Sequence, residues 1–226
     1  MIQQLSKMNL DTVLQGIKAV VFDLDGTLLD SIAMWKAIDS SFLRKRQLTI
    51  DYDHYFNATM GMTHPQRAKY TQESLNLKDT PEEIYNEWFT QYFNDFELQA
   101  NLFKGVLEFT SYLHNKGIKM SLGTASGMSV IQRLLQKYPL LKEHLEHTVT
   151  CDEVGSSKPN PAVFNEAMKR MGAKPEECLV FEDSVNGLIA AKASGATAIC
   201  VLSDQDLRKE KFEQANYWFE NWTDLL

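Results

Sequence analysis

The chain has 226 residues, of which 44% are hydrophobic and 23% are charged, and its formal net charge is −7. This length fits one domain, or a core domain with a smaller insertion, and the hydrophobic fraction is ample for a buried core. The acidic balance lacks the basic stripe that nucleic-acid binders need, so we expect no nucleic-acid partner. No apolar run approaches about 20 residues, and we expect neither a membrane span nor a secretory signal. The resulting expectation is a cytoplasmic protein, monomeric by default.

Residues 1–16 are expected to form an irregular or weakly helical extension without chemistry of its own. The apolar run Ala19 to Phe22 then predicts a buried parallel strand, since it is short, rich in β-branched residues and bounded by turn residues. Asp23 and Asp25 follow it at the carboxyl end, where ligands bind in open α/β sheets. Two carboxylates this close repel each other, and a divalent cation is the usual way to offset that cost.

Residues 31–102 are aromatic and helical in pattern and contain no strong strand signal. Asp30 or Ser31 can cap the first helix. Another helix starts at residues 80–83, where a capping threonine, a proline and a glutamate at the third position agree. Its apolar face carries Ile84, Trp88, Tyr92 and Phe96, a spacing typical of a core-facing stripe. We therefore predict a small helical domain inserted after the first strand.

Residues 103–226 alternate helices with strands. The predicted helices are 105–115, 126–138, 160–172 and 187–194, and the predicted strands are 118–124, 147–150, 178–181, 197–202 and 217–219. Strands separated by helices indicate a parallel sheet with right-handed crossovers. Together with residues 17–30, this segment predicts a Rossmann-like α/β core domain.

Three further polar clusters follow predicted strands or open predicted helices. Thr124, Ala125 and Ser126 stand at a strand-to-helix turn, where hydroxyls and free N–H groups can bind an anion. Lys158 precedes a helix in a stiff Lys-Pro-Asn-Pro setting. The adjacent acids at positions 182 and 183 offer the hard oxygen ligands that suit Mg²⁺.

The segment Phe22-Asp23-Leu24-Asp25-Gly26-Thr27-Leu28 resembles the first motif of the haloacid dehalogenase superfamily, and the other three clusters resemble its later motifs in the same order. The resemblance covers nearly the whole chain from about residue 17. It implies a Rossmann-like parallel sheet with an inserted helical cap domain over residues 31–102. Such a cap is similar to that of the subgroup containing β-phosphoglucomutase and sugar-phosphate phosphatases.

The resemblance also implies roles for the catalytic residues. Asp23 would attack phosphorus and form an aspartyl-phosphate, and Asp25 would transfer protons as the general acid and base. Lys158 would offset negative charge on both the nucleophile and the phosphoryl oxygens. Thr124 would hold the phosphoryl group, with the Ala125 N–H completing the cradle.

Ser126 would belong to the same substrate-binding cradle. The implied cofactor is Mg²⁺, held by the Asp23 carboxylate, the backbone carbonyl of Asp25, and the side chains of Glu182 and Asp183, with Asp183 as the more secure direct ligand.

The predicted function is therefore hydrolysis of a small phosphorylated metabolite, a sugar or polyol phosphate, by a Mg²⁺-dependent phosphatase. The alternative is a phosphosugar mutase of the β-phosphoglucomutase type. In that mutase a histidine follows the first motif by about ten residues, and an arginine ends a G-x-S-R stretch of the cap. This chain has Trp35 near the first position and Gly61-Met62-Thr63-His64 at the second, which favours the phosphatase. His64 is expected to be a surface or structural residue, with contact to the substrate as the alternative.

Overall fold

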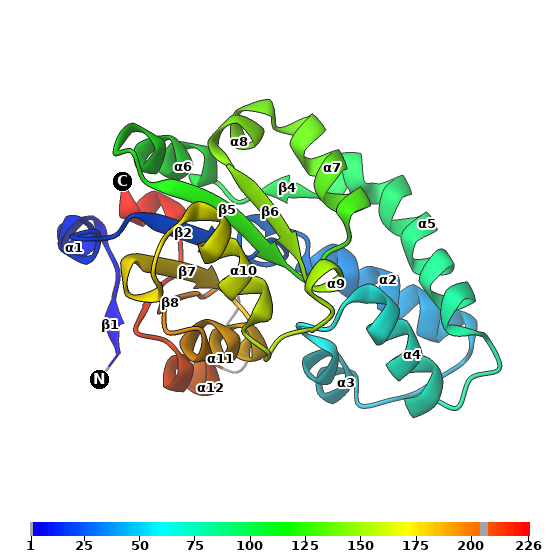
Figure 1. Cartoon of the computed structure of the whole chain (residues 1–226). Helices are drawn as coiled ribbons and strands as arrows, with labels where there is room; N and C mark the ends of the chain where they lie inside the picture. The colour runs from blue at the N-terminus through cyan, green and yellow to red at the C-terminus, as the bar shows by residue number, and fades with distance from the viewer. Residues whose placement is uncertain (1, 204–207) are drawn as a thin grey trace.

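The computed structural model describes residues 2–203 and 208–226, without the side chains of residues 96–98. Its main sheet contains seven strands: β1 (Gln3–Gln4), β2 (Ala19–Phe22), β5 (Lys119–Thr124), β6 (His147–Thr150), β7 (Cys178–Glu182), β8 (Thr197–Val201) and β9 (Tyr217–Phe219). All of them run parallel, in the order β1-β9-β8-β7-β2-β5-β6 (Figure 1). The predicted parallel α/β core is confirmed.

Helices cover both faces of this sheet. They are α1 (Lys7–Val13), α6 (Val106–Asn115), α7 (Met128–Lys137), α8 (Pro139–His144), α9 (Cys151–Val154), α10 (Ala162–Met171), α11 (Val185–Ala193) and α12 (Arg208–Gln214), with short 3-10 helices η1 (Pro175–Glu177) and η2 (Trp222–Leu225). Strand β2 shows why there are two layers. Val20 and Phe22 pack into the core under α6 and α7, whereas Ala19 and Val21 pack into the core under α10 and α11. A strand buried on both faces reads as a continuous apolar run.

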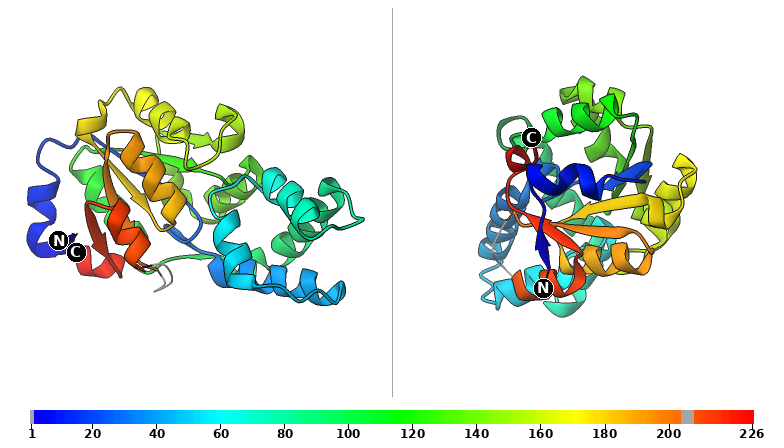
Figure 2. Two further views of the ribbon diagram at one scale, coloured as in Figure 1. Left: turned by 90° about the horizontal axis from the view of Figure 1, so that it is seen from below. Right: turned by 90° about the vertical axis from the view of Figure 1, so that its left-hand side faces the viewer.

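The inserted segment forms the helical unit that the sequence predicts. It consists of α2 (Ile32–Lys45), α3 (Tyr52–Thr59), α4 (His64–Ser74) and α5 (Pro81–Gln99), and lies beside the sheet layers at the carboxyl ends of the strands (Figure 2). The chain enters and leaves it through an antiparallel pair, β3 (Leu29–Asp30) and β4 (Asn101–Leu102). We refer to residues 31–102 as the cap.

The start of α5 follows the capping prediction. The Glu83 N–H donates to Thr80 Oγ1 at 3.2 Å, and the Thr80 N–H donates to Glu83 Oε2 at 2.7 Å. Ile84, Trp88 and Tyr92 are buried, as the stripe predicts. The predicted contribution of the Phe96 side chain lies outside the described residues.

The amino-terminal segment differs from the irregular extension that we expect from its sequence. Strand β1 pairs with β9 at the edge of the main sheet, and the Leu5 N–H donates to the Trp218 carbonyl at 2.7 Å. Leu5 and Leu10 are both buried. A strand of two residues is too short to show an alternation of apolar and polar side chains. Its pairing with a strand more than 200 residues away therefore leaves no local signal in the sequence.

Smaller differences concern helix boundaries. Helix α7 begins at Met128 with Gly127 as its N-cap, so Ser126 does not cap it. The short helices α8, α9 and α12 interrupt segments for which the sequence predicts no element.

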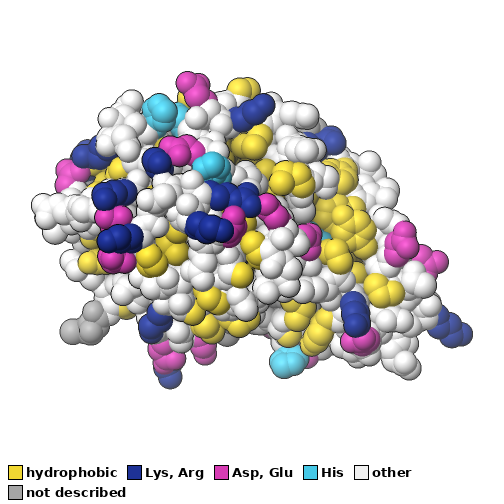
Figure 3. Space-filling model, viewed as in Figure 1, with side chains coloured by type: hydrophobic (Ala, Val, Ile, Leu, Met, Phe, Trp, Pro, Cys, Tyr) yellow, Lys and Arg dark blue, Asp and Glu magenta, His cyan; other side chains and the backbone are white. Residues whose placement is uncertain are grey.

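The surface mixes charges of both signs. On the face drawn in Figure 3, basic and acidic side chains lie beside one another over α10, where Arg170 pairs with Glu153 at 2.5 Å and with Glu166 at 3.0 Å. Within the described part of the chain, no helix is both long enough and apolar enough to cross a membrane.

Candidate active site

Three neighbouring strands bring polar side chains to one edge of the sheet. Asp23 follows β2, Thr124 ends β5 and Glu182 ends β7. Because β5, β2 and β7 are adjacent and parallel, with Phe22 paired to both flanking strands, these three positions lie side by side. The predicted site residues all line one cavity of about 80 Å³, namely Asp23, Asp25, Thr124, Ala125, Ser126, Lys158, Glu182 and Asp183.

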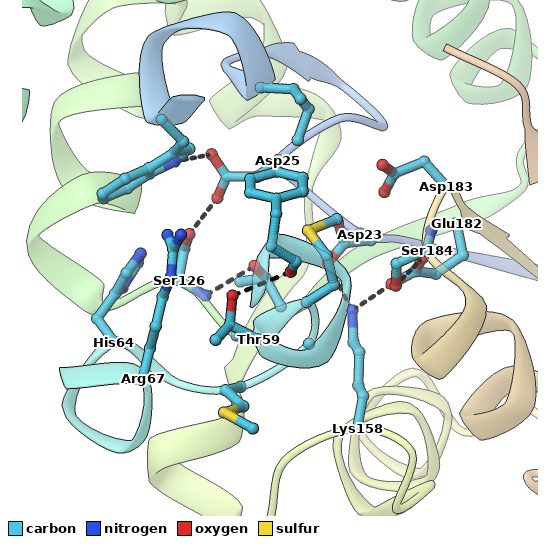
Figure 4. Close-up of a pocket in the computed structure, with 18 residues that line it drawn as sticks. Asp23, Asp25, Thr59, His64, Arg67, Ser126, Lys158, Glu182, Asp183 and Ser184 are labelled. Carbon is cyan, nitrogen blue, oxygen red and sulfur yellow. Dashed lines mark hydrogen bonds and ion pairs between the residues drawn. The ribbon is translucent and has the colours of Figure 1, made fainter. Parts of the chain in front are cut away.

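Lys158 reaches this edge from the loop after α9. Its ammonium donates to Asp23 Oδ1 at 2.5 Å and to Glu182 Oε1 at 2.7 Å, and all three side chains are buried (Figure 4). The other Glu182 oxygen, Oε2, accepts from the Ser184 N–H at 2.6 Å and from the Ser184 hydroxyl at 2.9 Å. Both oxygens of Glu182 are therefore used within the protein, and Glu182 fixes the position of Lys158.

The charges at this edge do not balance. Burial raises the pKa of Asp23 to about 7, Lys158 opposes that rise, and Glu182 and Asp25 add to it. Burial alone would lower the pKa of Lys158, but Asp23 and Glu182 outweigh burial and raise it. One ammonium thus faces more carboxylate charge than it can neutralise.

Asp183 lies against the first motif. Its Oδ1 accepts from the Thr27 hydroxyl at 3.3 Å. Gly26 has a φ of +80°, and a Cβ at this position would lie 2.2 Å from Asp183 Oδ2. Only glycine allows the backbone after Asp25 to adopt this conformation and to approach Asp183 so closely.

The acidic residues fit a divalent cation. Asp23, Glu182 and Asp183 each place one carboxylate oxygen within 4.8 Å of the others, and all three are buried. Hard oxygen donors are the ligands that Mg²⁺ prefers, and a bound cation would supply the positive charge that Lys158 alone does not.

Asp25 is held by three donors, two at the start of α2 in the cap and one in the turn after β5. Ser31 donates through its hydroxyl and Trp35 through Nε1, at 3.2 Å, both to Oδ1. The Ser126 hydroxyl donates to Oδ2 (Figure 4). The Ser126 N–H also donates to Thr124 Oγ1 at 3.0 Å, which ties the strand-end hydroxyl to the same turn. The carboxyl group of Asp25 is thereby fixed at the boundary between core and cap.

The cap supplies the opposite wall of the cavity. Its lining residues come from α2, α3, the α3–α4 turn and α4, and are Ile32, Trp35, Phe56, Thr59, Met60, Gly61, Met62, His64 and Arg67. The Asn186 side chain donates to the Met60 carbonyl at 2.8 Å and so joins α11 to that turn. The cavity lies between the two units.

His64 is buried and lines the cavity, so the expectation of a surface residue is wrong, while its structural character is clear. Its ring stacks on Trp35 with ring centroids 4.8 Å apart. Burial lowers the pKa of His64 to about 4; Asp25 opposes that change and Arg67 adds to it.

Sequence reasoning missed several residues of the site. Ser31 reads as a helix cap and Ser184 carries no prediction, yet both hydroxyls bond to acids of the site. Thr59 and Arg67 of the cap carry no motif. The available signal was the position of Ser184 directly after the predicted acidic pair.

Comparison with known proteins places this geometry in a family. The chain is 25% identical to hexitol phosphatase B of Escherichia coli O157:H7 over 92% of this chain and 94% of that protein. It is 30% identical to a Drosophila melanogaster protein named "Probable pseudouridine-5'-phosphatase", over 90% of this chain and 89% of that protein. A crystal structure of a hydrolase from Pseudomonas syringae superposes with a TM-score of 0.78 at 25% identity, covering 92% of this chain and 95% of that one.

The family model described as "haloacid dehalogenase-like hydrolase" matches residues 17–195, a span that holds both aspartates of the first motif, Lys158 and the acidic pair. The chain belongs to the haloacid dehalogenase-like hydrolases.

Proposed function

We propose that the protein is a Mg²⁺-dependent phosphatase that hydrolyses a small phosphomonoester, with sugar or polyol phosphates as the substrate class. The observation that carries this proposal is one cavity that holds two aspartates from a single strand end, a buried lysine and a second acidic pair. Membership of the hydrolase family supports hydrolysis, and the names of the two relatives support a phosphate ester as substrate.

Asp23 is the proposed nucleophile. Its carboxylate attacks phosphorus, the bond from phosphorus to the leaving-group oxygen breaks, and an aspartyl-phosphate forms. Lys158, 2.5 Å from Asp23 Oδ1, fixes the direction of the carboxylate and offsets charge on the phosphoryl oxygens.

Asp25 is the proposed general acid and base. It protonates the leaving alkoxide and then takes a proton from the water that hydrolyses the aspartyl-phosphate. The hydroxyls of Ser31 and Ser126 can rotate to donate or accept, so they hold Asp25 in either protonation state, whereas the Trp35 indole can only donate.

Thr124 and the backbone N–H of Ala125 are the proposed cradle for the phosphoryl oxygens, where most of the stabilisation in phosphoryl transfer arises. Ser126 stays in the substrate-binding set as predicted, but its hydroxyl bond to Asp25 favours a role in positioning that acid.

Asp23, Asp183 and the Asp25 backbone carbonyl are the proposed ligands of Mg²⁺. Glu182, the fourth predicted ligand, lies in the same cluster, but its bonds to Lys158 and Ser184 favour a contribution through charge and orientation. When bound, the ion would offset phosphate charge and keep Asp23 ionised for attack.

The domain division that we propose assigns residues 17–30 and 103–226 to the catalytic core and residues 31–102 to the cap. Residues 1–16 are counted with the core, because β1 belongs to the main sheet. The cap would exclude water and read the leaving group.

The proposal is tested by phosphate release from a panel of sugar, polyol and nucleotide monophosphates with Mg²⁺. Hydrolysis by the wild type and loss of turnover in Asp23→Asn are expected. An Asp23→Asn variant with wild-type activity would show that Asp23 is not the nucleophile. Net isomerisation of β-glucose 1-phosphate in the presence of glucose 1,6-bisphosphate, without phosphate release, would show that the protein is a phosphosugar mutase and not a phosphatase.

A further inference from the structure

Helix α4 presents two side chains, one turn apart, to the cavity. His64 and Arg67 both line it, and Figure 4 shows them on the side of the cavity where Ser126 and Asp25 lie. Arg67 is 7% exposed, so its guanidinium must find partners inside the protein or in a ligand. None of the catalytic steps proposed for this site involves Arg67.

The charge of Arg67 is already balanced. Its Nη2 donates to Asp39 Oδ2 at 2.5 Å, and Asp39 is 2% exposed on the neighbouring helix α2. The Tyr52 hydroxyl donates to the same Asp39 oxygen at 2.8 Å. Burial is the largest effect on the Arg67 guanidinium and would lower its pKa, but Asp39 together with Tyr55 and Tyr52 raises it. The guanidinium therefore stays charged, and its ion pair with Asp39 adds no net charge to the cap.

One donor of this guanidinium remains unused. Arg67 Nε is buried and has no hydrogen-bond partner among the residues that the structure describes, and the same holds for Oδ1 of its ion-pair partner Asp39. Aromatic rings pack around the guanidinium carbon at 5.2 Å (Trp88), 5.8 Å (Tyr55 and Phe56) and 5.9 Å (Trp35), and hold it in place. A buried N–H without a partner is costly, and an oxygen atom of a substrate in the cavity would remove that cost.

Among the described residues, the remaining walls of the cavity also provide no cation without a carboxylate partner. His64 is the other titratable side chain on the cap wall, and burial keeps its ring neutral near pH 7. On the core side, Lys158 is bonded to two carboxylates. A second phosphate or a carboxylate on the leaving group would therefore be buried against the cap without a counter-charge, at high cost.

We propose that Arg67 is a specificity-determining residue that donates its Nε–H to an uncharged oxygen of the leaving group. Its pairing with Asp39 makes the cap select monophosphates with neutral, hydroxyl-bearing leaving groups and reject those with a second anionic group. This inference rests on the proposed phosphatase function and narrows its substrate class.

The test compares esters of matched length whose leaving groups carry hydroxyls, a carboxylate or neither. Sorbitol 6-phosphate, 6-phosphogluconate and hexyl phosphate carry, respectively, hydroxyls alone, a carboxylate in place of the terminal hydroxymethyl group, and no hydroxyl. Glycerol 3-phosphate, 3-phosphoglycerate and propyl phosphate repeat the comparison at three carbons. We expect the wild type to prefer the hydroxyl ester over the carboxylate ester by at least about tenfold in kcat/KM at one of the two lengths.

Three variants test the role of Arg67. Arg67→Lys keeps the charge beside Asp39 but lacks Nε–H, so the ratio of kcat/KM for the hydroxyl ester to that for the alkyl ester falls by about 10- to 100-fold. Asp39→Asn leaves Arg67 unbalanced and raises the relative kcat/KM of the carboxylate ester about tenfold. Arg46→Lys is the control, because Arg46 pairs with Asp79 at 2.6 Å elsewhere in the cap and does not line the cavity.

The outcomes separate the two proposals. If no ester is hydrolysed with Mg²⁺, the phosphatase function fails and this inference fails with it. The wild type could hydrolyse carboxylate and hydroxyl esters equally well, or Arg67→Lys could lower kcat/KM for all esters by one common factor. Either result would leave the phosphatase function standing and show that the proposed role of Arg67 is wrong. Should Asp39→Asn fail to fold, the Arg67→Lys ratio alone decides.

Discussion

Trp35 of the cap donates its indole N–H to Asp25 of the core, with Nε1 3.2 Å from Oδ1. The ring is clamped between neighbours: it stacks on His64 at 4.8 Å and on Tyr92 at 4.7 Å between centroids. The proposed proton-transfer residue thus takes part of its position from the cap, so its geometry depends on the cap lying over the core.

Removing this donor should slow proton transfer more than it weakens binding. In Trp35→Phe we expect kcat to fall about tenfold, the effect of one lost hydrogen bond to a charged group, with KM changed much less. Steady-state kinetics on the best substrate measure both. Trp218→Phe is the matched control, because Trp218 packs on Phe212 outside the cavity. An unchanged kcat in Trp35→Phe would separate the indole from catalysis.

The Lys158 ion pairs should dominate local stability when metal is absent. Lys158→Met leaves Asp23 and Glu182 buried without a counter-charge, and we expect a loss of about 3–5 kcal/mol in the free energy of unfolding. Equilibrium urea unfolding in EDTA measures it, and adding Glu182→Gln should restore part of the loss. Lys18→Met removes an exposed pair with Glu177 (2.6 Å) and should cost far less. Equal losses in the two single variants would contradict this account.

Mg²⁺ should stabilise the folded chain through the acidic cluster. At about 100 times its dissociation constant, a ligand that binds only the folded state adds about 2.7 kcal/mol, which corresponds to a rise in Tm of roughly 5–10 °C for a chain of this size. Asp183→Asn should abolish the rise, whereas Asp53→Asn, an exposed acid on α3, should keep it. Thermal unfolding with Mg²⁺ and with EDTA provides the measurement, and an undiminished shift in Asp183→Asn would exclude Asp183 as a ligand.

His64 predicts a pH dependence of stability. Its pKa is about 4 in the folded chain and ordinarily 6.5, so between these values the unfolded chain binds more protons. The contribution of His64 to the free energy of unfolding is therefore fully present above about pH 6.5. Below that it falls by about 1.4 kcal/mol per pH unit down to about pH 4, a total loss of roughly 3 kcal/mol.

His64→Gln should remove this part of the pH dependence. Urea unfolding of both proteins at pH 7, 6 and 5 measures the difference. Parallel stability curves for wild type and His64→Gln would mean that the ring is not buried in its neutral form.

The fold was largely readable from the sequence because its signals are local. The run Ala19 to Phe22 and the regular alternation after residue 103 each predict their own element, and parallel pairing follows from the helices between strands. The cap could be recognised by the same means. Strand β1 could not, because two residues at a sheet edge gain their conformation from β9 alone.

The core side of the candidate site was also readable, since its acids and Lys158 stand at strand ends or helix starts that one sheet edge collects. Convergence on Asp25 was not readable. Ser31, Trp35 and Ser126 meet only after the cap has docked, and each has an ordinary local explanation as a cap or core residue.

Arg67 and Asp39 illustrate the same limit within the cap. They lie 28 positions apart on different helices, and each alone reads as a solvated charge. Only packing of α2 against α4 makes them a buried pair. The candidate catalytic residues could thus be predicted from motifs. The residues that face the leaving group could be identified only from the tertiary structure.

The most direct test of the central claim is to trap the covalent intermediate on Asp23. The enzyme is mixed with Mg²⁺ and its best phosphomonoester, quenched during turnover, and reduced with borohydride, which converts an aspartyl-phosphate to homoserine. Peptide mass spectrometry should then place homoserine at position 23, and at neither Asp25 nor Asp183. Phosphate release without homoserine at position 23, or homoserine at another aspartate, would contradict the proposed mechanism.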